Sequence, residues 1–381
     1  MRRVSFIQVG IGTVGGAVVQ QVLDHRDRWR RDLGLEVGVG AVVTRAGALV
    51  ALDPVGLPEE TLRAVVDGRR AGTGLSDIAR DRGMPLGAAG PEAIERPPAG
   101  ERLVVLDAAA GDATAALDVR ALEVGGGVVL SNKAPLALPA SDPAAAALWA
   151  AAGPHGRLRY EATCGAGLPV ISSLRSLLDT GDEVIEIQGA LSGTLGAIFS
   201  DVAAGQSFSA AVRSATERGY TEPDPRDDLS GLDVARKALI LARTIGRRVD
   251  LDAIEVESLV PPGLTEVSIA EFLERVAELD APIAARAAAA KSEGRALKYV
   301  ATVRPDGTIV VGVRPVDTST VLGALQGPET IVMIRTRRYD DYPLNVAGPG
   351  AGAAVTAAGM LADALALATG PLAGPVRGNE R

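Results

Sequence analysis

Residues 4–15 read VSFIQVGIGTVG, and this stretch decides the fold of the first part of the chain. It begins with an apolar, β-branched run without a turn residue, which is typical of a strand buried on both faces of a parallel sheet. Gly10, Gly12 and Gly15 follow at the spacing G-x-G-x-x-G, and a second apolar run covers 35–43. Because apolar residues recur at helical intervals between them, the stretch predicts a dinucleotide-binding unit.

Each glycine of this turn has a separate task in dinucleotide binding. Gly10 permits the tight turn, Gly12 lets the backbone approach the pyrophosphate, and Gly15 allows close packing of the helix. The amide groups at the helix start, those of Thr13 and Val14, then face the anion. We therefore predict that these five residues bind the cofactor.

Arg45 bears on which dinucleotide is bound. Thr44 and Arg45 end the second predicted strand, where an NAD-binding protein usually carries Asp or Glu for the ribose hydroxyls. A guanidinium suits a 2′-phosphate, so the sequence favours NADP, with NAD as a second possibility. The alternative, an ordinary surface arginine, stays open.

The alternation of strands and helices continues through the first part of the chain. Strands at 103–107 and 128–130, with a helix at 112–124 between them, indicate an α/β fold with a Rossmann-type doubly wound parallel sheet. From Arg157 onward the pattern changes, and a mixed α/β domain with a partly antiparallel sheet is expected. Its predicted strands are 157–162, 183–191, 296–303, 308–314 and 330–335.

Two domains agree with a length of 381 residues. We expect a dinucleotide-binding domain at 1–155 and a second domain at 156–349. The helix predicted at 350–370 is expected to pack back on the first domain.

The composition excludes several classes of protein. Against 39 Lys and Arg stand 47 Asp and Glu, and a net charge of −8 does not suit a nucleic-acid-binding protein. No apolar run approaches the length of a membrane span. The single cysteine, Cys164, forms no internal disulfide, so we expect a reducing, cytoplasmic location.

Lysine is rare in this chain, which makes each lysine a candidate for proton chemistry. Of the 39 basic residues only four are lysines, and lysine, unlike arginine, titrates when its surroundings lower its pKa. Lys133 lies in the segment SNKAP at 131–135, directly after a predicted buried strand, where ligands of open sheets bind. It either contacts the ligands or is a solvated loop cation.

The most acidic segment is GYTEPDPRDD at 219–228. Its prolines predict an extended or turned loop rather than a helix, so the carboxylates of Glu222 and Asp228 are displayed on a stiff support. On the apolar helix that follows, Asp233 and Lys237 are four residues apart and share one face. The segment suits a small substrate with an ammonium group and a reactive carbonyl. A solvated loop followed by a surface ion pair would give the same sequence pattern.

Cys164 lies in YEATCGAGLP at 160–169, just before a predicted helix. A thiol at a helix start can act as a nucleophile on an aldehyde. Without a histidine in sequence reach to activate it, a small buried apolar role is the simpler interpretation.

Together these motifs resemble the homoserine dehydrogenase family along nearly the whole chain. The segments that carry the resemblance are GIGTVG at 10–15, SNKAPLA at 131–137, YEATCGAGLPVI at 160–171, LSGTLGAIF at 191–199, GYTEPDPRDDLSGLDVARKALIL at 219–241 and GPGAG at 348–352. The resemblance implies NAD(P)-dependent, reversible reduction of aspartate 4-semialdehyde to homoserine, in threonine, methionine and isoleucine biosynthesis. It also implies that the second domain binds substrate and pairs two chains into a homodimer.

The resemblance assigns roles to individual residues. Lys237 corresponds to the proton donor and acceptor, and Lys133 to a lysine that contacts substrate or cofactor. Glu222 and Asp233 match substrate-binding residues, helped by Asp228. The glycines that match positions near the cofactor are Gly219 and Gly350. A sodium ion is expected at Glu161, Cys164, Ala166 and Leu168, mainly through main-chain carbonyls.

The chain also departs from the family pattern. At 108–110 it reads Ala-Ala-Ala where relatives commonly carry hydroxyls, so we expect Ala109 to contact the nicotinamide through its backbone only. The chain stops soon after the GPGAG helix, and we expect a short form without the C-terminal amino-acid-sensing domain.

Two other functions remain alternatives to a homoserine dehydrogenase. One is a semialdehyde dehydrogenase that acts through a Cys164 thioester. The other is a non-catalytic NADP-sensing protein of the same fold.

Overall fold

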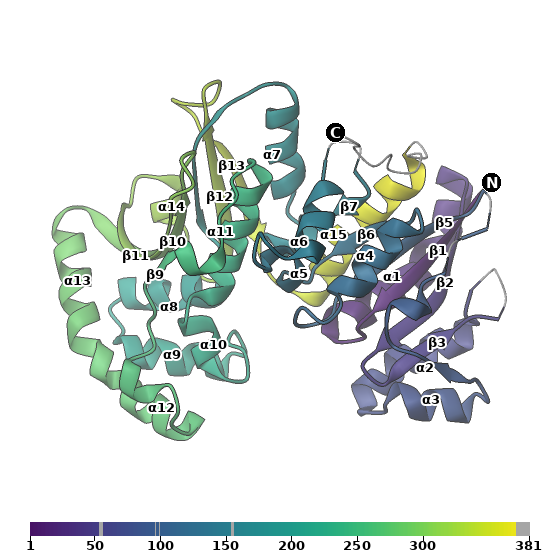
Figure 1. The fold of residues 1–381 in the computed structure, drawn as a ribbon. Coiled ribbons are helices and arrows are strands. Elements are labelled where there is room, and N and C mark those ends of the chain that lie inside the picture. Colours follow the sequence, from purple (N-terminus) through teal and green to yellow (C-terminus); the bar gives the residue numbers. More distant parts are fainter. Residues whose placement is uncertain (53–55, 96, 99, 154–155, 371–381) are drawn as a thin grey trace. The chain divides into compact units, whose positions relative to one another are not determined.

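The computed structural model describes residues 1–52, 56–95, 97–98, 100–153 and 156–370 (Figure 1). The chain divides into two compact units. The first contains Met1–Gly167 and the chain from Gly352 onward, and the second contains Leu168–Ala351. The chain thus leaves the first unit after 167, beyond the expected boundary at 155.

The described residues of the first unit form a seven-stranded sheet of order β4-β3-β2-β1-β5-β6-β7. Strands β2, β1, β5, β6 and β7 are parallel, and β3 and β4 extend one edge in antiparallel fashion. The strands are β1 (Arg2–Val9), β2 (Leu35–Thr44), β3 (Gly47–Val50), β4 (Leu86–Gly87), β5 (Arg102–Asp107), β6 (Gly127–Leu130) and β7 (Leu158–Arg159). This order confirms the predicted doubly wound sheet, whose strand order reverses between β1 and β5.

The helices of this unit are α1 (Thr13–Leu33), α2 (Glu59–Ala71), α3 (Leu75–Asp81), α4 (Ala115–Glu123), α5 (Ala134–Ala137), α6 (Pro143–Ala150) and α15 (Ala353–Thr369), with 3-10 turns η1 (Pro91–Ala93) and η2 (Glu161–Thr163). One core cluster joins β1, α1 and α15 through side chains such as Phe6, Val19 and Met360. The C-terminal helix α15 is tied to the sheet by Arg102, whose guanidinium donates to the carbonyl of Gly370 at 2.6 Å.

The described residues of the second unit form a six-stranded sheet of order β13-β12-β8-β10-β11-β9. All its pairs are antiparallel except β11 with β9, which confirms the expected mixed domain. The strands are β8 (Val184–Ala190), β9 (Glu255–Val256), β10 (Arg295–Val303), β11 (Ile309–Asp317), β12 (Glu329–Thr336) and β13 (Leu344–Pro349). The strand predicted at 157–162 is mostly wrong: only Leu158–Arg159 is a strand, β7 at the edge of the first sheet, and the 3-10 turn η2 begins at Glu161.

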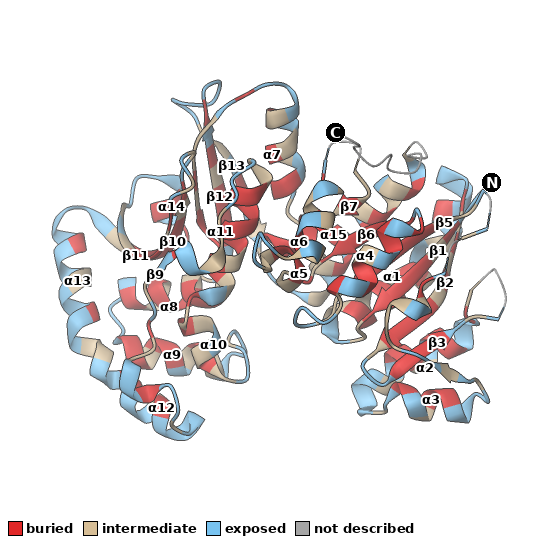
Figure 2. Ribbon diagram, viewed as in Figure 1, coloured by how far each residue is buried: buried red, intermediate tan, exposed pale blue. Residues whose placement is uncertain are grey.

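The helices of the second unit are α7 (Val170–Asp179), α8 (Gly193–Ala203), α9 (Phe208–Glu217), α10 (Pro225–Leu229), α11 (Leu232–Thr244), α12 (Ile269–Arg275), α13 (Asp280–Ser292) and α14 (Val321–Ala324), with 3-10 turns η3 (Leu251–Ala253), η4 (Pro262–Leu264) and η5 (Val276–Leu279). Buried residues follow the inner strands of each sheet and the helix faces that cover them (Figure 2).

Two glycines of the LSGTLG segment set the position of α8. A Cβ atom on Gly193 would lie 2.9 Å from the carbonyl oxygen of Pro328, and one on Gly196 would lie 2.9 Å from that of Gly327. Only glycine lets the helix approach these carbonyls so closely. The start of α8 is thereby fixed against the segment that leads into β12.

No helix in the described part of the chain is both long and apolar enough to cross a bilayer.

Candidate active site

A pocket of about 680 Å³ lies in the first unit where β1, β2 and β5 end. The ends of these parallel strands flank the point where the strand order reverses, which is where open α/β sheets bind ligands. Its volume is in the usual range for a small-molecule or cofactor site. Among the residues predicted to bind the cofactor, those that line it are Gly10, Gly12, Arg45 and Ala109.

The three glycines of the turn differ in the space around them. Gly10 has a φ of 75°, and a Cβ atom on it would lie 2.9 Å from the backbone of Ala109. On Gly15 a Cβ atom would overlap the carbonyl oxygen of Gly10. Next to Gly12 no atom lies within 4 Å of that position, so its open side is left for a ligand. This arrangement fits a pyrophosphate next to Gly12.

The start of α1 also suits an anion. Its N-cap residue, Gly12, provides no side-chain hydrogen bond, and its first turn carries no acidic residue. The amide groups there, including that of Val14, therefore face outward with the positive end of the helix dipole. The residues present fit a dinucleotide.

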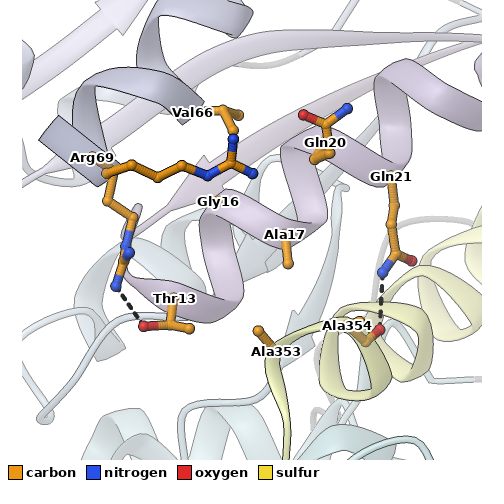
Figure 3. Close-up of a pocket in the computed structure, with 10 residues that line it drawn as sticks. Thr13, Gly16, Ala17, Gln20, Gln21, Val66, Arg69, Ala353 and Ala354 are labelled. Carbon is orange, nitrogen blue, oxygen red and sulfur yellow. Dashed lines mark hydrogen bonds between the residues drawn. The ribbon is translucent and has the colours of Figure 1, made fainter.

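A second pocket of about 360 Å³ lies between α1, α2 and α15 of the first unit (Figure 3). Thr13 faces this pocket, and its hydroxyl accepts a hydrogen bond from the guanidinium of Arg69 on α2 (Figure 3). Gln21 closes another side by donating to the carbonyl of Ala354 at 2.9 Å. Sequence reasoning missed Arg69, because nothing in the sequence shows that α2 places it next to the glycine turn.

Lys133 is the N-cap residue of the short helix α5, in the loop that follows β6. It is half-buried. The preceding residue, Asn132, is buried and anchors the loop by donating to the carboxylate of Asp107 at 3.0 Å. Lys133 therefore lies on a fixed loop at the carboxyl end of the first sheet.

In the second unit, the acidic segment is organised around Asp228. The carboxylate of Asp228 accepts the backbone N–H of Glu222 at 2.8 Å, which closes the loop between them. Burial raises the pKa of Asp228, and the nearby charges of Glu222 and Asp233 raise it further. Thr194, at the start of α8, donates to the carbonyl of Tyr220 at 2.6 Å, which fixes the start of the acidic segment against that helix.

The loop prediction for the acidic segment is partly wrong, because Pro225–Leu229 forms the short helix α10. Asp224 is its N-cap and accepts the N–H of Arg226, and proline is favoured at the first helical position. The Arg226 guanidinium pairs with Asp224 at 2.6 Å and lowers the pKa of that carboxyl. It also donates to three carbonyls, those of Leu264, Thr265 and Val267. The segment is therefore stiff.

Lys237 is almost buried on α11, with 9% of its surface exposed. Its ammonium group lies 2.9 Å from the carboxylate of Asp233, one turn earlier on the same helix. It also donates to the carbonyl of Leu191, just before α8, at 2.6 Å. The sequence predicted the pairing with Asp233 from their spacing, but a carbonyl 46 residues away in the chain could not be foreseen.

The two glycines expected near the cofactor both belong to the second unit. Gly219 follows α9 with a φ of 69° and leads into the acidic segment. Gly350 follows β13, and a Cβ atom on it would overlap the hydroxyl of Thr330. Their contact with a cofactor stays a prediction.

The comparisons with known proteins agree with the resemblance. The model of the homoserine dehydrogenase family matches residues 169–365, which is more than half of the chain. This chain belongs to the homoserine dehydrogenase family. It is 36% identical over 363 residues to the bifunctional aspartokinase/homoserine dehydrogenase of Haemophilus influenzae, covering 95% of this chain and 42% of that protein.

Two solved structures are similar to this family member over nearly its whole length. One is a protein of unknown function from Candida auris, 30% identical, with a TM-score of 0.78 over 96% of this chain and 98% of that one. The other is a putative homoserine dehydrogenase from Archaeoglobus fulgidus, 26% identical, with a TM-score of 0.72 over 97% and 100%. The chain spans less than two thirds of the length of the curated relatives that it matches.

The residues that the family resemblance assigns to sodium lie where the chain passes from one unit to the other. Glu161 and Cys164 are buried, Ala166 has a φ of 55°, and Leu168 opens the second unit. Among the described residues no three His, Cys, Asp or Glu side chains cluster as a metal site. A hard cation here would therefore depend on main-chain oxygens and on the Glu161 carboxylate.

The thiol of Cys164 is fully buried in this homoserine dehydrogenase family member. The hydroxyl of Thr163 lies 3.7 Å from its sulfur. A thiolate nucleophile needs access to its substrate, so this environment favours the small apolar role over a thioester.

Proposed function

We propose that this chain is an NADP-linked homoserine dehydrogenase that reversibly reduces aspartate 4-semialdehyde to homoserine. The observation that carries the proposal is the ammonium group of Lys237, almost buried between the carboxylate of Asp233 and the carbonyl of Leu191. A shielded and positioned ammonium group is suited to give a proton to a carbonyl oxygen.

The cofactor residues are those of the first unit. Gly10, Gly12, Val14 and Gly15 shape the turn at the start of α1, and Arg45 on the rim of the pocket suits the 2′-phosphate of NADP. The nicotinamide, when bound, supplies or accepts the hydride. The backbone of Ala109 contributes to the pocket in which it is held.

Lys237 transfers the proton. In the reductive direction its ammonium group stabilises the developing alkoxide and donates a proton to it. In the oxidative direction the amine must be neutral to accept the proton of the alcohol. Because an ordinary lysine keeps its proton at neutral pH, homoserine oxidation should become faster as the pH rises.

The carboxylates of the second unit orient the substrate. Glu222 is exposed and Asp228 is half-buried on the segment stiffened by Arg226, so their charge is available to the α-ammonium group. Asp233 pairs with Lys237 and adds to the same negative field. Lys133 of the first unit contacts substrate or cofactor in this proposal.

Three further features belong to the proposal. A sodium ion is held by Glu161 and by the carbonyls of Cys164, Ala166 and Leu168, which a higher melting temperature in NaCl than in KCl would support. The chain forms a homodimer, which light scattering measures. The protein acts in the cytoplasm, which agrees with its single cysteine.

The decisive experiment measures NADP reduction with homoserine for the wild type, Lys237→Ala and the exposed control Lys291→Ala. We expect Lys237→Ala to lose at least roughly 100-fold in turnover with NADPH affinity kept, and the control to keep both. An active Lys237→Ala variant would overturn the assignment. A wild type that binds NADPH but turns over no homoserine would favour the non-catalytic alternative.

A further inference from the structure

The first unit contains two carboxyl groups that are both fully buried. Asp107 ends β5, and Asp118 lies on α4, each with 0% of its surface exposed. Neither oxygen of Asp118 meets an N–H or O–H donor in the described part of the chain. Its backbone N–H donates to the carbonyl of Thr114 at 3.0 Å, and the hydroxyl of Thr114 donates to the carboxylate of Asp107 at 2.7 Å, so Asp118 lies one helical turn from that carboxylate.

Two carboxylates in contact without solvent cannot both carry charge. Burial raises the pKa of Asp118 well above its ordinary value, and the charge of Asp107 raises it further. Burial also raises the pKa of Asp107, but the hydrogen bonds that Asp107 accepts from Ala109, Thr114 and Asn132 offset part of that rise. The proton therefore belongs on Asp118, where it turns two facing acceptors into a donor and an acceptor.

Asp107 connects two loops that the proposed function uses. One carboxylate oxygen accepts the backbone N–H of Ala109 at 2.8 Å. The other accepts the hydroxyl of Thr114 at 2.7 Å and the side-chain amide of Asn132 at 3.0 Å. Ala109 and Thr114 line the dinucleotide pocket, and Asn132 immediately precedes Lys133.

Asn132 continues this network within the lysine loop. Its carbonyl oxygen accepts the N–H of Ala134 at 3.1 Å, and its amide also donates to the carbonyl of Gly111 at 2.7 Å. The floor of the pocket and the Lys133 loop are thus fastened to the same carboxylate. Any rotation of the Asp107 side chain would move both.

We propose that Asp118 is a positioning residue that acts as a neutral carboxylic acid. It donates a hydrogen bond to Asp107 and so holds the pocket residues bound to Asp107 and the Lys133 loop in fixed positions relative to each other. Asp118 does not line the pocket and acts only through Asp107. The role for Lys133 rests on the proposed function, whereas the protonation of Asp118 does not.

Two substitutions of similar size separate the hydrogen-bond donor at position 118 from the space that the side chain fills. Asp118→Asn keeps nearly the same shape and an N–H donor toward Asp107, so we expect NADPH affinity within about twofold of wild type. Asp118→Leu has a similar size but no donor, and we expect NADPH binding to weaken at least tenfold with the fold retained by circular dichroism. Asp112→Asn, at an exposed position just before α4, is the matched control and should bind as wild type does.

Infrared spectroscopy with ¹³C-labelled aspartate tests the proton directly and needs no activity. We expect the wild type at neutral pH to show the carbonyl band of a protonated carboxylic acid, and Asp118→Asn to lack that band. If Asp118→Leu does not fold, this comparison still decides the protonation. A wild type without the band, or an Asn variant that binds NADPH as poorly as the Leu variant, would overturn the proposal.

The outcomes distinguish this inference from the proposed function. Tight NADPH binding with the expected variant pattern but no homoserine turnover would refute the activity and leave the positioning role intact. Normal homoserine turnover in Asp118→Leu, with unchanged NADPH binding, would refute the positioning role and leave the activity intact.

Discussion

Both units of this chain bring carboxyl groups together, but in opposite surroundings. In the first unit, Asp107 and Asp118 are both fully buried, and the charge of Asp107 adds to the rise that burial causes in the pKa of Asp118. In the second unit, Glu222 is exposed and the Asp233 side chain, 44% exposed, pairs with Lys237. Solvent access therefore decides what these carboxyl groups can do. The buried pair holds a proton and fixes the positions of its neighbours, whereas the exposed carboxylates stay charged and can bind a ligand.

This difference makes substitutions in the two units separable. Changes among the open carboxylates should alter how homoserine is bound and turned over, with the cofactor unaffected. Changes in the first unit outside the Lys133 loop should alter stability or cofactor affinity, with the Michaelis constant for homoserine unaffected.

Among the variants that keep Lys237, the largest effect is expected for Asp233→Asn. The ammonium group of Lys237 would lose the carboxylate that lies 2.9 Å away and would keep its hydrogen bond to the neutral carbonyl of Leu191. We expect turnover of homoserine to fall roughly 10- to 100-fold in steady-state assays with NADPH affinity kept. Asp233→Glu, which keeps the charge, should recover part of the loss. Weaker NADPH binding with normal turnover would contradict the division of labour.

Asp228→Asn should have a smaller effect that falls on substrate binding. Asparagine keeps an oxygen for the N–H of Glu222, so the loop stays closed and only a charge is removed. We expect the Michaelis constant for homoserine to rise about tenfold, as for the loss of one charged hydrogen bond. The neighbouring exposed Asp227→Asn is the control. Equal effects from the two variants would mean that only the net charge of the segment matters.

The sequence predicted those features that depend on neighbours along the chain. The glycine spacing at 10–15 gave the dinucleotide turn, and the four-residue spacing of Asp233 and Lys237 gave their pairing, because one strand–turn–helix or one helix face fixes both. The helix at 225–229 was missed because the two prolines were interpreted as helix-breaking residues. One of them occupies the first helical position, where proline is favoured.

The remaining site features depend on how separate elements pack. The placement of Asp118 near Asp107 depends on how α4 packs on the sheet, and the hydrogen bond of Arg69 to Thr13 depends on how α2 packs against α1. No local pattern encodes such distances. The one signal for Asp118 in the sequence was an aspartate among the apolar residues of the helix predicted at 112–124.

The buried pair predicts a pH dependence of stability with a definite sign. Above the ordinary pKa of aspartate the native state keeps a proton on Asp118 that the unfolded chain has released, so the wild type loses stability as the pH rises. Asp118→Asn removes that loss. Its stability relative to wild type should therefore increase with pH, by at most about 1.4 kcal/mol per pH unit.

Urea unfolding at pH 5, 6 and 7 measures this effect. The only tryptophans of the chain, Trp29 and Trp149, both belong to the first unit, so their fluorescence reports on the unit that contains the pair. A difference between the two proteins that stays constant with pH would show that Asp118 is ionised in the native state.

The smallest effect is expected for Arg45→Ala, which tests an exposed charge of the first unit rather than its buried pair. Arg45 lines the pocket at the end of β2 but is open to water, and a solvated charge pair contributes no more than about 1 kcal/mol. We expect the dissociation constant of NADPH to rise about three- to fivefold, that of NADH to stay constant, and the preference to weaken with salt. Arg28→Ala, an exposed arginine on α1, controls for net charge. If the affinities for NADPH and NADH fall equally, Arg45 does not recognise the 2′-phosphate. A changed Michaelis constant for homoserine would show that cofactor binding and substrate binding are not divided between the two units as their carboxylates suggest.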